Sequence, residues 1–148
     1  MDEKRYDVLK LENQVCFPLY ACAREVIKWY KPFLDEIDLT YTQYIAMMVL
    51  WENKSLTVKD LGERLFLDSG TLTPMLKKME LKGLLTRKRS TEDERSLIVS
   101  ITEQGEALRE KALSIPVQIA NCSNLEPEEM ASLYHILYRL LGRGKASL

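Results

Sequence analysis

The feature that most constrains the fold is a change of hydrophobic period that follows two short helical segments. Apolar residues recur at helical spacing up to about residue 83, whereas 84–89 and 96–101 have the apolar, β-branched character of strands around the polar turn 90–95. Two short helices joined by a tight turn predict a helix-turn-helix, and a hairpin directly after them predicts a wing. We therefore expect a mainly α-helical fold with a small β-hairpin wing, a winged helix-turn-helix.

Polar capping residues mark the helix starts in this region. Thr40 and Gln43 have the spacing of a capping box, and Thr57 with Asp60 repeats that spacing. Asp68 precedes the second helix of the motif, where its side chain can accept from the first free amides. A helix is expected to begin after each of Thr40, Thr57 and Asp68.

Two further amphipathic segments flank this region. The first is 17–34, with Pro18 in its first turn, and Pro127 opens the second. The apolar stripe of the last helix comprises Met130, Leu133, Tyr134, Leu137, Leu140 and Leu141. Such a stripe is too large to leave in water, so we expect segments 7–36 and 103–148 to form a homodimer interface beside the DNA-binding region 40–101. Packing of the last helix onto its own domain is the alternative.

The charges of the chain are unevenly distributed. Residues 77–89 hold six basic side chains and one acid, a local net charge of +5 in a chain whose net charge is −1. A solvated basic face would account for this run, but its place beside a predicted helix-turn-helix favours contact with nucleic acid. Double-stranded DNA is the expected partner.

The residues expected to touch DNA lie on the second helix of the motif and on the wing. The helix supplies Ser69, Thr71 and Thr73 for bases or phosphates and Lys77 and Lys78 for phosphates, and the hairpin supplies Arg87, Arg89, Asp93 and Arg95. An arginine on a protruding hairpin suits a narrow minor groove, and we expect the carboxylate of Asp93 to hold the guanidinium of Arg95 in position.

Cys16 is the strongest candidate for chemistry. It lies at the start of the helix that holds Pro18, where amide dipoles favour the thiolate that attacks a peroxide. No Lys or Arg lies within four residues of it, and Glu12 opposes a negative charge there. Cys122 lies in a polar segment where a resolving thiol could be exposed, whereas Cys22 is expected to fill the core.

Other classes of function find little support. No Cys/His spacing typical of zinc is present, the single histidine, His135, is expected at a surface or interface, and no cofactor or metal is expected. The charged N-terminus has no secretory character and no stretch approaches the roughly 20 apolar residues of a membrane span, so we expect a cytoplasmic protein that does not enter the membrane.

Four segments together resemble a known family. They are LENQVCFPLYA from residue 11, LTYTQYIAMMVLWE from residue 39, LTVKDLGERLFLDSGTLTPMLKKMELKGLLTRKRS from residue 56 and EDERSLIVSITEQG from residue 92. They closely resemble the MarR family, specifically its organic-hydroperoxide-sensing repressors of the OhrR type. The similarity covers residues from about 8 to 120.

The resemblance implies both a mechanism and roles for individual residues. Such proteins are homodimers that repress peroxidase genes when reduced and leave operator DNA when an organic hydroperoxide oxidises the cysteine that corresponds to Cys16. Tyr30 and Tyr41 correspond to the tyrosines that hydrogen-bond its sulfur, with Tyr20 nearby. One-cysteine members then form a mixed disulfide with a low-molecular-weight thiol. Two-cysteine members close an intersubunit disulfide, for which Cys122 is the candidate here.

Three alternatives stay open at this point. A MarR-type regulator released by a small anionic or phenolic ligand would bind DNA regardless of peroxide. A thiol peroxidase would turn over peroxide in a steady-state assay, but we expect no enzyme because that activity explains neither the wing nor the basic segment. A pure interaction module would show no sequence-specific affinity for DNA.

Overall fold

The structure, a computed structural model, describes residues 3–142. In chain order it contains η1 (Glu3–Leu9), η2 (Leu11–Asn13), α1 (Cys16–Asp35), α2 (Tyr41–Asn53), β1 (Ser55–Thr57), α3 (Val58–Leu65), α4 (Ser69–Leu81), β2 (Leu85–Arg89), β3 (Leu97–Ile101), α5 (Glu103–Ala112), α6 (Ile115–Ala120) and α7 (Pro127–Leu140). η1 and η2 are 3₁₀ helices. The winged helix-turn-helix expected from the sequence is confirmed, and the part of segment 103–148 beyond residue 142 lies outside the described residues.

The predicted capping residues begin the helices of the motif. The hydroxyl of Thr40 accepts from the amide of Gln43, whose side-chain oxygen accepts from the Thr40 amide at 3.1 Å, a complete capping box. Thr57 accepts from the amide of Asp60 at 3.1 Å at the start of α3. The carboxylate of Asp68 accepts from the Thr71 amide at 2.7 Å at the start of α4. The sequence-based starts of α2, α3 and α4 are therefore confirmed.

The sheet has a third strand that the sequence pattern did not predict. Its order is β1-β3-β2, with β3 antiparallel to both neighbours. Leu56 of β1 pairs with Val99, which in turn lies opposite Arg87 of β2. A strand of three residues is too short to show an alternating pattern, so the predicted two-stranded hairpin was incomplete.

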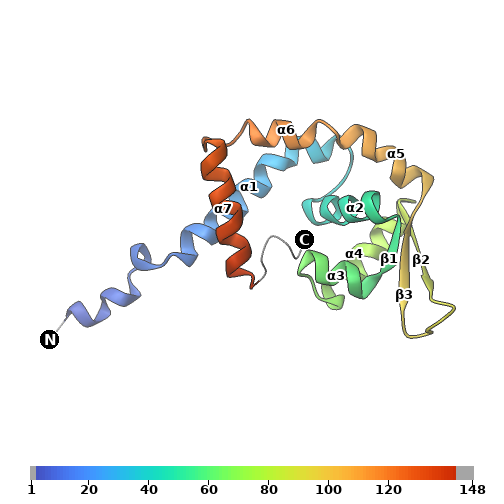
Figure 1. Cartoon of the computed structure of the whole chain (residues 1–148), viewed down its shortest axis with the longest axis horizontal. Helices are drawn as coiled ribbons and strands as arrows, with labels where there is room; N and C mark the ends of the chain where they lie inside the picture. The colour runs from blue at the N-terminus through green and yellow to red at the C-terminus, as the bar shows by residue number, and fades with distance from the viewer. Residues whose placement is uncertain (1–2, 143–148) are drawn as a thin grey trace.

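The core lies where α2, α3 and α4 pack against the base of the sheet. Its fully buried side chains are Met47, Leu50, Leu61, Leu72, Leu76, Met79, Leu85 and Val99. Leu34 at the end of α1 and Ile115 at the start of α6 cover one side of it. The helices α2, α3 and α4 thus form a folded unit with the sheet around this apolar interior, and the β2–β3 hairpin projects from it (Figure 1).

The two ends of the described chain contribute almost nothing to this core. No residue of η1, η2 or α7 is buried, and in α1 only Leu34 is. η1, η2 and the first half of α1 extend away from the winged helix (Figure 1). A compact monomer of this mass exposes about 7,800 Å², whereas this chain exposes 11043 Å². This chain therefore exposes more surface than a compact monomer of the same mass.

Within residues 3–142, no helix combines the length and the apolar content that crossing a bilayer requires.

Candidate functional site

The first half of α4 presents an exposed polar surface. Ser69, Thr71 and Thr73 are exposed, as are Lys77 and Lys78 one turn further along. The Thr73 hydroxyl donates to the carbonyl oxygen of Ser69 at 2.8 Å, so its oxygen remains available to accept. All five predicted α4 contacts therefore lie on the solvent side of this helix.

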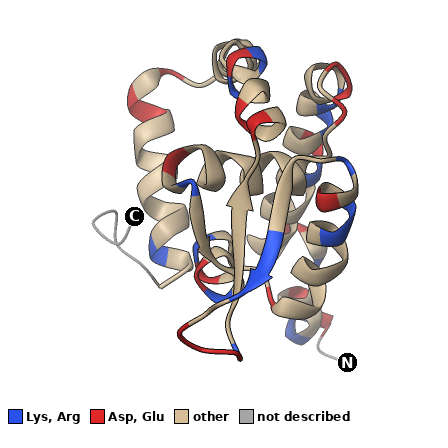
Figure 2. Cartoon of the chain, turned by 90° about the vertical axis from the view of Figure 1, so that its right-hand side faces the viewer, with Lys and Arg blue, Asp and Glu red and all other residues tan. Residues whose placement is uncertain are grey.

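The wing carries basic side chains along β2 and acidic side chains at its tip (Figure 2). Arg89 and Arg95 are exposed, and Nη1 of Arg89 donates to the carbonyl oxygen of Glu94 at 2.9 Å. Asp93 accepts from the backbone amide of Arg95 at 3.0 Å, and no ion pair joins the two side chains within residues 3–142. The expectation that Asp93 holds the guanidinium is therefore wrong. Its carboxylate shapes the turn that presents Arg95.

Arg87 differs from the other predicted DNA contacts. Its backbone amide and its guanidinium both donate to the carboxylate of Glu80, at 2.8 Å from the amide and 3.1 Å from Nη2. Its side chain is only 17% exposed. The hydrogen bond from the backbone amide of Arg87 is the largest cause, and those from its side chain the next, that hold the pKa of the Glu80 carboxyl below its ordinary value. Sequence analysis counted Glu80 only as the one acid in the basic run 77–89 and did not predict its pairing with Arg87.

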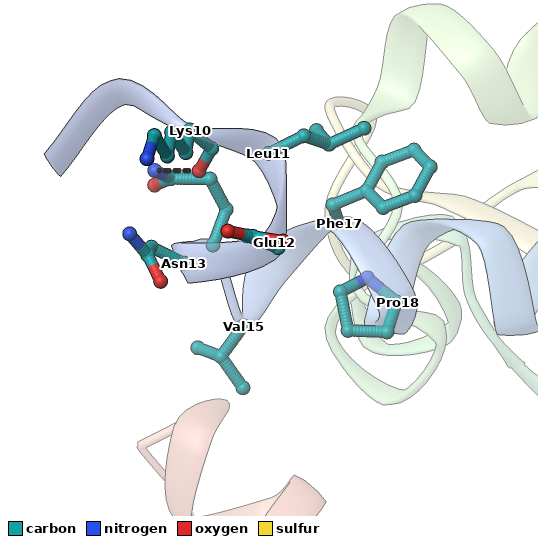
Figure 3. Close-up of a pocket in the computed structure, with 8 residues that line it drawn as sticks. Lys10, Leu11, Glu12, Asn13, Val15, Phe17 and Pro18 are labelled. Carbon is teal, nitrogen blue, oxygen red and sulfur yellow. Dashed lines mark hydrogen bonds between the residues drawn. The ribbon is translucent and has the colours of Figure 1, made fainter. Parts of the chain in front are cut away.

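Cys16 is the first residue of α1 and is exposed. The preceding turn and the start of α1 form an open groove of about 1000 Å³ (Figure 3), whose lining includes the two sequence neighbours of Cys16, Val15 and Phe17. The groove is lined by Lys10, Leu11, Glu12, Asn13, Gln14, Val15, Phe17 and Pro18. Pro18 lies in the first helical turn, as predicted. The cysteine thus stands at a helix start next to a partly apolar surface.

The tyrosines assigned to the cysteine lie in two places. Tyr20, one turn after Cys16, is exposed, and its hydroxyl accepts from Arg24 at 3.4 Å. Tyr30 and Tyr41 pack against each other with ring centroids 4.9 Å apart. Tyr30 follows Cys16 by 14 residues in one helix, which is about 21 Å along the axis. Within one chain, therefore, the structure brings Tyr30 to Tyr41 and neither of them to Cys16.

A third tyrosine completes this cluster. Tyr44 lies 5.7 Å from Tyr30, ring centroid to ring centroid, and 6.4 Å from Trp51. The pKa of Tyr30 is raised to about 12, mainly by burial of its phenol and to a lesser extent by the neighbouring Tyr41 and Tyr44. Sequence reasoning missed Tyr44 because its position on α2 reads as an ordinary core position.

The remaining cysteines and the histidine are all exposed. The Cys122 thiol, just after α6, donates to the carbonyl oxygen of Gln118 at 3.4 Å. Cys22 lies exposed on α1, where residues 16–25 are all exposed, so the expectation that it fills the core of the subunit is wrong. His135 stacks edge-on against Tyr134. In the described part of the chain, no three His, Cys, Asp or Glu residues gather as metal ligands would.

The chain was compared with families and with individual proteins. The family described as transcriptional regulator SarA/Rot matches residues 28–112. The organic hydroperoxide resistance transcriptional regulator of Bacillus subtilis (strain 168) is 56% identical over 139 residues, which cover 94% of this chain and 95% of that protein. The transcriptional regulator SarZ of Staphylococcus aureus is 43% identical over 133 residues, which cover 90% of both.

Solved structures of AbfR from Staphylococcus epidermidis have the same fold. Reduced AbfR bound to DNA superimposes with a TM-score of 0.77 at 31% identity, covering 95% of this chain and 97% of that one. The disulfide form of AbfR gives a TM-score of 0.64 at 32% identity over 95% of this chain and 99% of that one. Given the relatives and this fold, the chain belongs to the MarR family, within its organic hydroperoxide resistance regulators of the OhrR type.

Proposed function

We propose that this protein is a redox-sensing transcriptional repressor. Its reduced homodimer binds operator DNA, and oxidation of Cys16 by an organic hydroperoxide releases it. The observation that carries the proposal is the combination, in one chain, of an exposed Cys16 at a helix start with a capped α4 and a basic wing. The relatives support it, because one is a regulator of organic hydroperoxide resistance and AbfR has been solved reduced on DNA and as a disulfide.

DNA recognition follows from the exposed side chains of α4 and the wing. The start of α4 suits the major groove, where Ser69, Thr71 and Thr73 can reach base edges or phosphates. Lys77 and Lys78 suit phosphates, and Arg95 at the wing tip suits the minor groove.

The partner in the dimer is a second copy of this chain. Large apolar side chains are exposed along η1, η2, α1 and α7, among them Leu9, Val15, Phe17, Ile136 and Leu140. A monomer with this surface would aggregate or associate, and two copies can bury it reciprocally. The dimerisation segments are 7–36 and 103–148, and they flank the DNA-binding region 40–101.

The sensing site is shared between the two subunits. Because Tyr30 lies about 21 Å from Cys16 along one helix, the phenols of Tyr30 and Tyr41 can approach only the Cys16 of the partner. The hydroxyl of Tyr30, whose pKa burial raises to about 12, is protonated and can donate a hydrogen bond to a thiolate. Tyr20, one turn from Cys16, supports the cysteine of its own chain.

The chemistry begins when the Cys16 thiolate attacks one peroxide oxygen. The O–O bond breaks, an alcohol leaves after taking up a proton, and Cys16 becomes a sulfenic acid. The thiolate of Cys122 from the other subunit then attacks that sulfur, hydroxide leaves and takes up a proton to become water, and an intersubunit disulfide forms. Where Cys122 fails to reach, a low-molecular-weight thiol completes the same exchange. The peroxide acts as a signal, and no enzymatic turnover follows.

Mixed dimers test the shared site. A Cys16→Ser chain and a Tyr30→Phe/Tyr41→Phe chain, co-refolded and purified through two different tags, restore one intact site only if cysteine and tyrosines come from different chains. We expect peroxide to release DNA from the mixed dimer at lower peroxide concentration than from the double-tyrosine homodimer. An equal dose dependence would contradict the shared site. Failure of the reduced wild-type protein to bind its promoter DNA would contradict the function itself.

A further inference from the structure

Glu80 and Arg87 form the most extensively hydrogen-bonded ion pair of the surface that α4 and the wing present. Three donors of one residue meet one carboxylate: the amide of Arg87 at 2.8 Å, Nη2 at 3.1 Å and Nε at 3.3 Å. Glu80 lies in the last turn of α4, and Arg87 lies in the middle of β2. The pair therefore joins the helix expected in the major groove to the strand that carries the wing.

The surroundings of the pair fix the base of the wing at a second point. Gly83, with φ +80°, makes the tight turn between α4 and β2, and its carbonyl oxygen accepts from the Thr102 hydroxyl. Opposite Arg87 on β3 lies Val99, which is completely buried. The strand is thus held by the turn at one end, by the core beneath it and by the carboxylate of Glu80.

The geometry leaves Arg87 poorly placed to contact a phosphate. Two of its guanidinium nitrogens face Glu80, and the adjacent carboxylate would repel a DNA phosphate. Lys88 and Arg89, in contrast, are exposed on the same strand. From this we infer, on the basis of the proposed function, that Glu80 and Arg87 are positioning residues that set the wing relative to α4, and that Arg87 makes no DNA contact.

The two interpretations of Arg87 predict opposite changes in DNA affinity for the substitution Glu80→Gln. If Arg87 contacts phosphate, Glu80→Gln removes a repelling charge and frees the arginine, so DNA binding becomes tighter. If the pair positions the wing, Glu80→Gln weakens binding. Fluorescence anisotropy with the reduced dimer and its promoter DNA should compare wild type, Glu80→Gln, Arg87→Gln and the double variant. Glu92→Gln removes an acid from the wing tip as the matched control.

We expect each single substitution to weaken binding roughly tenfold, and the double variant to be no weaker than either single one. Glu92→Gln should bind as well as wild type or better. The slope of log affinity against log salt concentration should be the same for Arg87→Gln as for wild type. Lys78→Gln, which removes a phosphate contact, should lower the magnitude of that slope by about 0.9. Hydroxyl-radical footprints of Glu80→Gln should lose the backbone protection that the wing gives and keep the backbone protection that α4 gives. Tighter binding of Glu80→Gln, or a reduced slope for Arg87→Gln, would overturn the inference.

Hydrogen exchange of the free protein separates this inference from the proposed function. In Glu80→Gln the amide of Arg87 and the amides of the wing should exchange faster, with the core amides of α2 unchanged. This result is expected even if the protein were found not to bind promoter DNA, which would defeat the proposed function alone. Unchanged exchange in the wing would overturn the positioning role.

Discussion

The indole Nε1 of Trp51 donates a hydrogen bond to the carbonyl oxygen of Gly105 at 2.9 Å, and this buried contact fastens the end of α2 to the first turn of α5. A second link lies beside it, because the ammonium of Lys54 pairs with Glu106 at 2.6 Å. The chain continues from α5 into α6 and α7. In the proposed dimer, a movement of the dimerisation segments would reach the winged helix through this junction.

Replacing Trp51 by Phe keeps a ring in the core but removes the donor to Gly105. We expect the free energy of unfolding to fall by about 1 to 3 kcal/mol, from the lost hydrogen bond and the smaller ring. Urea denaturation followed by circular dichroism measures it. Met48→Leu, at a more exposed position of the same helix, should change the value by less than about 0.5 kcal/mol. Equal effects would show that the Trp51–Gly105 contact adds no stability.

Gly105 also sets how closely α5 approaches the sheet. A Cβ at this position would stand 2.2 Å from the carbonyl oxygen of Leu84 and 2.9 Å from Cγ1 of Ile101. Gly105→Ala should therefore destabilise the protein by about 1 to 3 kcal/mol, although alanine is the better helix former. The same substitution at exposed Gly70 in α4 should stay within about 1 kcal/mol. Thermal unfolding of both variants provides the comparison, and a stabilised Gly105→Ala would refute the close packing.

The tyrosine cluster predicts a loss of stability at high pH. Because burial raises the pKa of Tyr30 to about 12 from 10.0, the unfolded chain releases this proton first as pH rises. The stabilisation by the neutral phenol is complete below pH 10 and is lost as pH rises toward 12. Between pH 9 and 11, the unfolding free energy of Tyr30→Phe should therefore fall less steeply than that of wild type. Parallel pH profiles would contradict the raised pKa.

Much of this fold is predictable from the sequence, because its signals are local. Capping residues such as Thr40 and Asp68 define helix starts within one turn, and the polar run 90–95 separates two strands. β1 was not predicted because three residues are too few to show an alternating pattern of apolar and polar side chains. Its partner strand, β3, lies more than forty positions along the chain.

The candidate site is less accessible to such reasoning, since its contacts span elements. The Glu80–Arg87 pair joins a helix to a strand, and a charge count can only add the two residues together. Cys22 looked like core filler because an apolar helix face does not say whether its own chain or a partner covers it. Cys16 and Tyr30 lie apart in one chain because 14 residues of the same helix separate them.

The proposed role of Cys122 leads to a prediction about an intersubunit disulfide. After treatment with an organic hydroperoxide, wild-type protein should run as a disulfide-linked dimer on non-reducing electrophoresis, and Cys122→Ser should run as a monomer. Cys22→Ser is the matched control and should still form the dimer. A monomer from oxidised wild type would exclude the intersubunit disulfide and leave the mixed disulfide with a small thiol.

The central claim is that the oxidation state of Cys16 controls DNA binding. The most direct measurement is the affinity for the protein's own promoter DNA, for wild type and Cys16→Ser, each reduced and each treated with an organic hydroperoxide. We predict that both reduced proteins bind, that oxidised wild type loses most of its affinity, and that oxidised Cys16→Ser keeps its affinity. Equal binding by all four samples would contradict the claim and indicate a regulator that responds to a small ligand.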